Sequence, residues 1–465
     1  MIFRQVMHDD LGCASYLVGD ERTGRAAVVD PKFEIDEYLQ LARYHGLSIE
    51  HILETHNHAD HVSGHGRLAA ATGATIHIHR LASPDYEHEP FDDGFELSLG
   101  DVRIRALHTP GHRPEHTAFL LYDVRRSQQP WALLTGDSLF VGDIARPDLA
   151  IEKHEGARGI FRSLRRMLEL PEHVEIWPGH IGGSLCGGDT VDRKPVSTLG
   201  YERLHNEMLA VTDEDEFVDR ATRDLPPQPP NFQAIVALNR GPLLIDGVEA
   251  RPLTPRQVLL KQHAGALVVD VRTALQFDEA HVPGAVSIPA TGAGFGTKLA
   301  WIADRDQEIV FVGRDDADGR RAVALAEAVG LRRIAGFLAG GMTSWREERR
   351  PVRRIERMSA SELRERLATR DGLQVLDVRE RSEWRRCRIP GSVNIPYHEL
   401  TSVPPGIDLA RPIATVCGTG SRAGTAASLL ARLGASRVLH VADGGVATWR
   451  EAGWPVEGEA VTLRA

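Results

Sequence analysis

The sequence predicts an α/β protein built from about three domains, and three observations lead to that prediction. The chain has 465 residues, which is too long for a single hydrophobic core. In its first half, apolar β-branched runs end directly at histidine and aspartate side chains. Its second half contains an internal repeat in which short β-branched runs alternate with helical patterns. Alternation of this kind is typical of domains with parallel sheets.

Composition narrows the class of protein. The chain is 42% hydrophobic and 26% charged, as expected for a globular enzyme, and its net charge of −10 argues against a nucleic-acid partner. No apolar run approaches the length of a membrane span, and the first residues, "MIFRQVMHDDLGC", are acidic where a signal peptide would be apolar. The four cysteines form no CxxC pair, which fits a reducing compartment. We therefore expect a cytoplasmic enzyme with no membrane partner.

The internal repeat and a proline-rich stretch predict the domain boundaries. "LVVDVR" at residues 267–272 recurs as "QVLDVR" at residues 374–379, and "VPGAVSIP" recurs as "IPGSVNIP". Two repeats of roughly 100 residues each indicate two units with one fold. "DLPPQPPNFQ" at residues 224–233 is too rich in proline for a helix or a central strand, so we interpret it as a connector. The expected domains are 1–245, 250–352 and 355–465.

Metal-ligand residues follow four apolar runs in the first domain. Ligand groups at the ends of neighbouring strands converge at one edge of a sheet, where α/β proteins build their sites. Glycine before three of these residues permits the tight turns that aim the side chains inward. This clustering predicts a metal site formed from His56, His58, Asp60, His61, His112, Asp137 and His180.

The motifs "THNHADH", "TPGH", "TGDSLF" and "WPGH" resemble the metallo-β-lactamase superfamily. The resemblance covers residues 1 to about 245 and implies an αβ/βα sandwich. Two branches keep all seven residues, so the ligands alone do not separate them. A resemblance to persulfide dioxygenases implies one Fe²⁺ held by His56, His112 and Asp137, with His58, Asp60, His61 and His180 orienting those ligands. A resemblance to glyoxalase II implies two Zn²⁺ that activate a bridging water.

Two features favour the dioxygenase branch. "GDIARPDL" resembles the arginine-containing loop of persulfide dioxygenases, which implies that Arg146 binds an anionic thiol substrate. The structural alternative for Arg146 is an ion pair with Asp143 or Asp148. The chain also continues into a proline-rich connector and sulfur-type modules instead of the helical substrate domain of glyoxalase II.

Other candidate residues of the first domain receive simpler interpretations. We expect Asp30 to form a turn and Cys13 to lie in the core. Cys186 follows His180 closely on a glycine-rich segment, so a sulfur-handling role and a plain loop role both stay open. The remaining histidines are expected to be structural or exposed: His65, His77, His79, His88 and His108.

The stretch "CGTGSR" lies between the apolar run "PIATV" and a predicted helix. A cysteine in this position faces backbone N–H groups and the positive end of the helix dipole, which favour a thiolate nucleophile. The stretch resembles the active loop of the rhodanese family. That resemblance implies a persulfide-carrying Cys417, a catalytic Arg422, and substrate binding by Gly418, Thr419, Gly420 and Ser421. A phosphatase of the Cdc25 type is the competitor, but its loop is one residue longer.

The first repeat lacks this chemistry. Cys417 aligns with Gly313, and Arg422 aligns with Asp318. The sequence between them, "RDDAD", is acidic where an anion would bind. We therefore expect a degenerate rhodanese with a scaffold or docking role and no chemistry of its own.

The whole chain resembles bacterial persulfide dioxygenase–rhodanese fusions with one degenerate and one active rhodanese unit. That resemblance implies oxidation of a low-molecular-weight persulfide by O₂ to sulfite, with Cys417 exchanging sulfur with thiosulfate. The direction of transfer and the identity of the thiol stay open. The alternatives are a dizinc thioester hydrolase fused to a rhodanese and a sulfur-relay or sensing protein. We expect a homo-oligomer, either a dimer or a tetramer.

Overall fold

The fold is described from a computed structural model of the whole chain. The structure describes residues 1–8, 11–182, 191–223, 225–291, 294–369 and 372–458. The chain forms two compact units, the first mainly from Met1–Gly247 and the second from most of the chain beyond Val248. These units do not test the three predicted domain boundaries, which stay predictions.

The first unit contains two six-stranded sheets, with strand orders β1-β2-β3-β4-β5-β6 and β12-β11-β10-β9-β8-β7. The strands of the first sheet are β1 (Ile2–His8), β2 (Cys13–Gly19), β3 (Arg25–Val29), β4 (Ser48–Leu53), β5 (Thr75–His79) and β6 (Glu89–Phe91). Those of the second are β7 (Glu96–Ser98), β8 (Val102–His108), β9 (Thr117–Asp123), β10 (Ala132–Gly136), β11 (Glu175–Pro178) and β12 (Ser197–Thr198).

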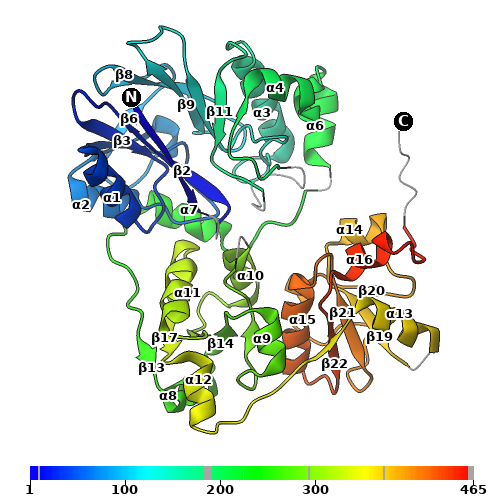
Figure 1. Cartoon of the computed structure of the whole chain (residues 1–465). Coiled ribbons are helices and arrows are strands. Elements are labelled where there is room, and N and C mark those ends of the chain that lie inside the picture. The colour runs from blue at the N-terminus through cyan, green and yellow to red at the C-terminus, as the bar shows by residue number, and fades with distance from the viewer. Residues whose placement is uncertain (9–10, 183–190, 224, 292–293, 370–371, 459–465) are drawn as a thin grey trace. The chain divides into compact units, whose positions relative to one another are not determined.

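Helices cover the outer faces of both sheets (Figure 1). The helices of this unit are α1 (Asp36–His45), α2 (His65–Thr72), α3 (Lys153–Met167), α4 (Leu199–His205), α5 (Glu207–Ala210), α6 (Glu214–Thr222) and α7 (Phe232–Arg240), with a 3₁₀ turn η1 at Arg80–Ala82. Residues of α1 and α2 pack on the first sheet, and residues of α3 and α6 pack on the second. A third apolar cluster fills the space between the sheets. These four layers confirm the predicted αβ/βα sandwich.

The second unit contains two five-stranded parallel sheets. Their strand orders, β13-β17-β16-β14-β15 and β18-β22-β21-β19-β20, are the same when corresponding strands are compared. The strands of the first sheet are β13 (Pro252–Leu253), β14 (Leu267–Asp270), β15 (Val286–Ser287), β16 (Ile309–Val312) and β17 (Ile334–Leu338). Those of the second are β18 (Glu356–Met358), β19 (Gln374–Asp377), β20 (Val393–Asn394), β21 (Ile413–Val416) and β22 (Val438–Val441). The internal repeat in the sequence is therefore a repeat of one fold.

Nine helices belong to the part of the chain beyond Val248 that the structure describes. They are α8 (Pro255–His263), α9 (Ala274–Glu279), α10 (Phe295–Ile302), α11 (Asp316–Ala328), α12 (Gly341–Glu347), α13 (Ala360–Thr369), α14 (Arg381–Arg386), α15 (Ser421–Arg432) and α16 (Gly445–Glu451), with a 3₁₀ turn η2 at Tyr397–Glu399. One apolar cluster contains residues of both sheets, so the two repeats of this unit share a core.

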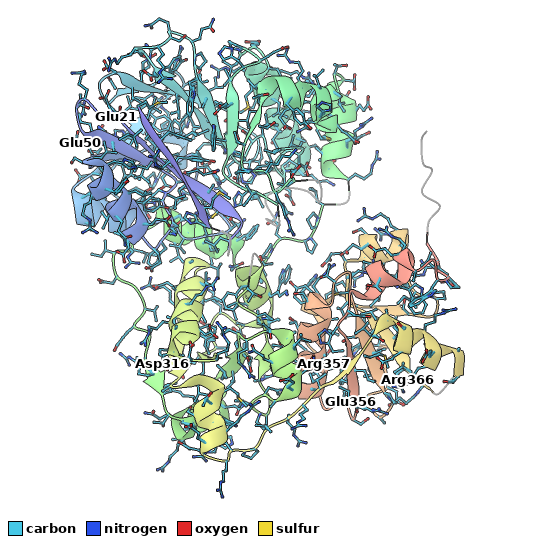
Figure 2. All side chains as sticks on the ribbon, viewed as in Figure 1. Glu21, Glu50, Asp316, Glu356, Arg357 and Arg366 are labelled. Carbon is cyan, nitrogen blue, oxygen red and sulfur yellow. The ribbon has the colours of Figure 1, made fainter. Side chains whose placement is uncertain are left out.

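Charged side chains such as Glu21, Glu356 and Arg357 are exposed (Figure 2). Among the described residues, no helix combines the length and the apolar character needed to cross a membrane.

Candidate functional site

The predicted metal ligands all follow strand ends. His56, His58 and His61 come after β4, and His112 comes shortly after β8. Asp137 and His180 follow β10 and β11, which are adjacent parallel strands. The side chains of all these residues except Asp60 are buried, with at most 2% of the residue surface exposed. Placement at strand ends therefore brings the ligands together, as the sequence predicts.

Three of these residues form a compact set. One potential ligand atom from each of His56, His112 and Asp137 lies within 4.8 Å of the others. The Asp137 Oδ2 atom is 3.9 Å from His56 Nε2 and 3.6 Å from His112 Nε2. All three atoms are buried and lack a hydrogen-bond partner among the described residues. Buried polar atoms are rarely left unpaired in a folded protein, so this arrangement fits a bound metal ion.

Neighbouring groups hold the two histidines in the ligand orientation. The Thr55 hydroxyl donates to Asp30 Oδ2 at 2.9 Å, so its oxygen is free to accept the Nδ1–H of His56, also at 2.9 Å. The Nδ1–H of His112 donates to the backbone carbonyl of Arg146 at 3.0 Å. Both interactions leave Nε2 unprotonated and directed at the shared centre. Burial lowers the pKa of His56 and His112, which keeps both rings in the neutral form that binds metals.

His180 lies between two carboxylates. Its Nδ1 donates to Asp137 Oδ1 and its Nε2 donates to Asp60 Oδ2, both at 2.7 Å. Burial alone would lower the pKa of His180, but the two carboxylates raise it well above the usual value. Asp137 thus has one oxygen engaged by His180 and the other directed at the candidate metal position.

The rest of the predicted set forms a neighbouring group. Potential ligand atoms of His58, Asp60 and His61 also lie within 4.8 Å of one another, and the Asp60 carboxylate is 3.1 Å from His61 Nδ1. His58 Nε2 is 3.2 Å from Asp30 Oδ1 and 3.6 Å from Glu54 Oε2. This group has the donors for a second metal ion, and it also has the hydrogen-bonding partners expected of residues that orient the first.

Two supporting residues, Asp30 and His116, lie beside the candidate ligands and are not predicted from the sequence. Asp30 has a φ of 49° and so forms the expected turn, but its carboxylate also accepts from both the backbone N–H and the hydroxyl of Thr55. His116 Nε2 accepts the backbone N–H of Asp137 at 2.8 Å. Each residue lies next to a β-strand, but its partner belongs to a different strand-end loop. A single sequence does not reveal such pairing.

The roles expected of Arg146 and Cys186 stay predictions. The Arg146 guanidinium is buried and makes two hydrogen bonds to Asp148, at 2.7 and 2.8 Å, and one to the Pro226 carbonyl. This is the ion pair that the sequence left as the alternative to substrate binding. Cys186 lies outside the described residues.

The sulfur loop begins at the end of β21. Cys417 is 1% exposed, and its Sγ accepts the backbone N–H of Gly420 at 3.0 Å. Gly420 has a φ of 91° and precedes α15, so the sulfur lies at the N-terminal end of a helix of twelve residues. The Gly420 N–H and the positive end of the helix dipole therefore both face the sulfur. The other loop residues, Gly418, Thr419 and Ser421, are partly or fully exposed.

Arg422 is the last residue of the CGTGSR stretch, and its positive charge is paired with the Glu383 carboxylate. Its guanidinium makes two hydrogen bonds to the Glu383 carboxylate, at 2.6 and 2.9 Å. Burial opposes the charge on Arg422, but Glu383 raises its pKa further above the usual value. Arg422 therefore stays cationic, while Glu383 neutralises part of its attraction for an anion.

The aligned loop of the first repeat has no room for a nucleophile. A Cβ atom on Gly313 would lie 2.5 Å from the Asp318 Cβ. Asp318 instead pairs with Arg314 at 2.8 Å. The loop is thus closed by its own ion pair, and the absence of chemistry in the first repeat stays a prediction.

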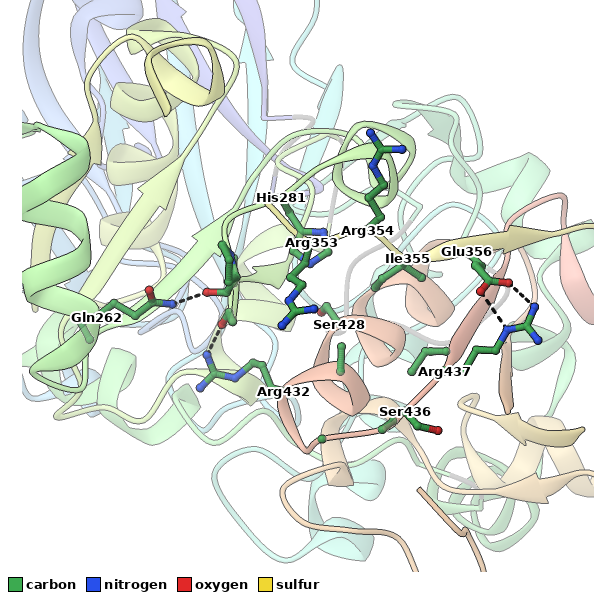
Figure 3. A pocket seen from close by; sticks show the side chains of 18 of the residues that line it. Gln262, His281, Arg353, Arg354, Ile355, Glu356, Ser428, Arg432, Ser436 and Arg437 are labelled. Atoms are coloured by element: carbon green, nitrogen blue, oxygen red, sulfur yellow. Dashed lines mark hydrogen bonds and ion pairs between the residues drawn. The ribbon is translucent and has the colours of Figure 1, made fainter. Parts of the chain in front are cut away.

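A separate cavity of about 730 Å³ lies within the second unit. Its lining includes Gln262, His281, Arg353 and Arg437, and Arg437 pairs with Glu356 at 2.7 Å (Figure 3). No residue of the Cys417 loop lines it, so we do not assign it to the sulfur site.

Comparison with known proteins identifies both parts of the chain. Residues 8–180 match the metallo-β-lactamase superfamily model, and residues 254–348 and 359–452 match the rhodanese-like domain model. The chain is a metallo-β-lactamase superfamily protein with two rhodanese-like domains. A metallo-β-lactamase from Staphylococcus aureus subsp. aureus COL has a similar structure, with a TM-score of 0.64 and 31% identity. The match covers 73% of this chain and 98% of the other.

Two curated relatives represent the two branches. The mitochondrial persulfide dioxygenase ETHE1 of Bos taurus is 27% identical over 242 residues, which is 51% of this chain and 87% of the relative. The hydroxyacylglutathione hydrolase of Rhodospirillum rubrum is 33% identical over 171 residues, which is 36% of this chain and 60% of the relative. A β-lactamase hydrolase-like protein of Agrobacterium fabrum is matched over 53% of its length. The chain thus spans little more than half of some curated relatives that it matches.

Proposed function

We propose that the chain is a bifunctional sulfur-metabolism enzyme, an iron-dependent persulfide dioxygenase coupled to a rhodanese. The observation that carries the first activity is the set of unpaired buried atoms on His56, His112 and Asp137. Two imidazoles and one carboxylate on one face are the ligand set of non-haem Fe²⁺ oxygenases, which keep coordination positions open. The similarity to a persulfide dioxygenase supports this proposal.

The dioxygenase reaction needs O₂ and a persulfide. In balanced form, R–S–SH, O₂ and H₂O give R–SH and sulfite with two protons. Iron, when bound, supplies the site at which O₂ and the terminal sulfur meet. The chain supplies the geometry, because Thr55 and the Arg146 carbonyl fix the two imidazoles and His180 fixes the carboxylate.

The rhodanese reaction needs only a thiolate and an anionic donor. The Cys417 thiolate attacks the outer sulfur of thiosulfate and forms a Cys–S–S bond. The S–S bond of thiosulfate breaks, and its electron pair leaves with sulfite, so the total charge is conserved. The Gly420 N–H and the α15 N-terminus stabilise negative charge on the sulfur before and after the transfer.

The two activities share sulfite. The first produces it, and a Cys417 persulfide can donate sulfur to it to give thiosulfate; in reverse, thiosulfate can load Cys417. We propose cytoplasmic sulfide detoxification as the setting, because the Cys417 thiol must stay reduced in order to react. The proposal also includes substrate binding by Arg146, sulfur handling by Cys186 and a homo-oligomeric state.

A dizinc thioester hydrolase is the second candidate. The group formed by His58, Asp60 and His61 could hold a second ion, and the similarity to hydroxyacylglutathione hydrolase supports this candidate. A sulfur-relay or sensing protein is a third candidate of a different class. It would consume persulfide at most once per chain.

Oxygen consumption with glutathione persulfide tests the proposal on the full chain. We expect multiple turnovers by the wild type, loss of oxygen uptake in His112→Ala, and normal oxygen uptake without sulfur transfer in Cys417→Ser. The relay candidate predicts no more than one turnover per chain, and the hydrolase candidate predicts thioester hydrolysis with no oxygen uptake. Either result would contradict the proposal.

A further inference from the structure

A lysine of the first rhodanese-like domain lies at the sulfur loop of the second. Lys298 belongs to α10, and its Nζ donates to the Ser421 hydroxyl at 2.6 Å. Ser421 belongs to the CGTGSR loop and is the first residue of α15. The domain without a nucleophile therefore places a cation beside the nucleophile of its neighbour.

The positive charge of Lys298 has no carboxylate partner among the described residues. Arg422 is held by two hydrogen bonds to Glu383, whereas Lys298 forms no ion pair among the described residues. Burial lowers the pKa of Lys298 to about 8, and the Cys417 sulfur opposes that shift. Lys298 is thus mostly charged at neutral pH and lies within electrostatic range of the sulfur.

The first rhodanese-like domain also contacts α15, the helix that follows the Cys417 loop, at its N-terminal end. His440 on β22 contacts Asp278 Oδ2 through Nδ1 at 2.8 Å and the Gly420 carbonyl through Nε2 at 2.9 Å. Both ring nitrogens lie within hydrogen-bonding distance of an oxygen atom, so His440 links Asp278 to the N-terminal end of α15. Asp278 belongs to α9, which lies beside α15 (Figure 1).

A second contact holds the same helix in its middle. The backbone N–H of Ser287 on β15 donates to the Ser428 hydroxyl at 3.0 Å, and both residues are buried. These contacts hold α15, whose first residue is Ser421, against the rhodanese-like domain that carries Lys298.

We propose that Lys298 and Ser421 form an anion-binding subsite beside Cys417 that takes the oxyanion end of a dianionic sulfur donor such as thiosulfate. This inference rests on the proposed rhodanese function and deepens it. A lysine ammonium and a serine hydroxyl are suitable donors for sulfonate-type oxygens. The same subsite would hold the departing sulfite when its S–S bond breaks. The degenerate domain then supplies substrate recognition to the active one.

Alkylation of Cys417 in the full chain tests this subsite independently of sulfur transfer. Iodoacetate carries a carboxylate and iodoacetamide is neutral, so the ratio of their rates cancels any change in the thiolate fraction. Rates are followed by mass spectrometry of the Cys417 peptide. We expect Lys298→Met to lower the iodoacetate-to-iodoacetamide ratio about tenfold, as for loss of a charge-assisted contact. Lys298→Arg should retain the wild-type ratio.

Lys261→Met is the matched control. Lys261 lies in the same domain and pairs with Glu308, so its loss changes the net charge equally without contacting the loop. Its ratio should equal that of the wild type. Steady-state transfer from thiosulfate to cyanide should show a higher KM in Lys298→Met, with a smaller change in kcat.

The outcomes separate the two claims. If wild-type Cys417 is alkylated readily but the ratio is unchanged in Lys298→Met, the subsite is wrong and the rhodanese function stands. If the wild type transfers no sulfur from thiosulfate, the proposed rhodanese function itself fails.

Discussion

His56 is held by two residues, Asp30 and Thr55, that lie outside the proposed set of iron ligands. Asp30 accepts two hydrogen bonds from Thr55, and the Thr55 oxygen then accepts the Nδ1–H of His56. Without the threonine oxygen, the imidazole would lose the contact that selects its tautomer. Metal affinity is therefore expected to depend on a side chain outside the ligand set.

Thr55→Val tests this dependence. The change keeps the shape of the side chain and removes the acceptor for His56, so we expect metal affinity to fall about 10- to 100-fold. Competition with a chelator, read by metal analysis, measures the effect. Thr222→Val is the control, because the buried Thr222 hydroxyl donates only to the Val218 carbonyl on α6. Equal affinity in Thr55→Val and wild type would show that the Asp30–Thr55 pair does not orient the ligand.

The candidate ligands could be predicted because their positions at strand ends are visible in a single sequence. The second role of Asp30 could not, since that role depends on Thr55 in another loop. The position of Lys298 could not be predicted either, because only the fold places α10 of one repeat against the loop of the other. Contacts between distant segments are the part of the site that sequence does not show.

At the scale of elements, the start of α16 packs against the backbone of the Cys417 loop. Gly445 has a φ of 52°, and a Cβ there would lie 2.3 Å from the Cys417 carbonyl oxygen. The Val446 N–H donates to that same oxygen at 2.9 Å. The close approach of α16 to the loop therefore requires glycine.

Gly445→Ala should displace the Cys417 carbonyl and its loop. We expect a loss of about 1–3 kcal/mol in the stability of the second unit and a large loss of sulfur transfer, with oxygen uptake retained. Thermal unfolding and the two activity assays measure these effects. Gly453→Ala is the matched control, since Gly453 has a φ of 68° and no neighbour within 4 Å of the added Cβ. If both variants behave alike, left-handed strain and not the contact with Cys417 explains the effect.

Helices and strands predicted from local sequence patterns are present in the structure. The helix expected after Cys417 is present as α15, with Gly434 just beyond its end at a φ of 92°. The two repeats share strand order, as their matching motifs predict. The position of α10 could not be predicted, because the second repeat has no matching sequence there.

At the scale of the whole molecule, the fold class predicted from the sequence is confirmed, and the family models match both parts of the chain. The first repeat is expected to have a scaffold or docking role without chemistry, and the proposed subsite would add substrate binding to that role. The proposed function predicts a single iron held by His56, His112 and Asp137.

Metal content of protein purified without added metal, measured together with oxygen uptake on glutathione persulfide, tests the central claim most directly. We expect one iron per chain in the wild type, loss of iron and oxygen uptake in His112→Ala, and retention of one iron in His61→Ala. Two zinc ions per chain in the wild type, with one lost in His61→Ala and no oxygen uptake, would contradict the claim.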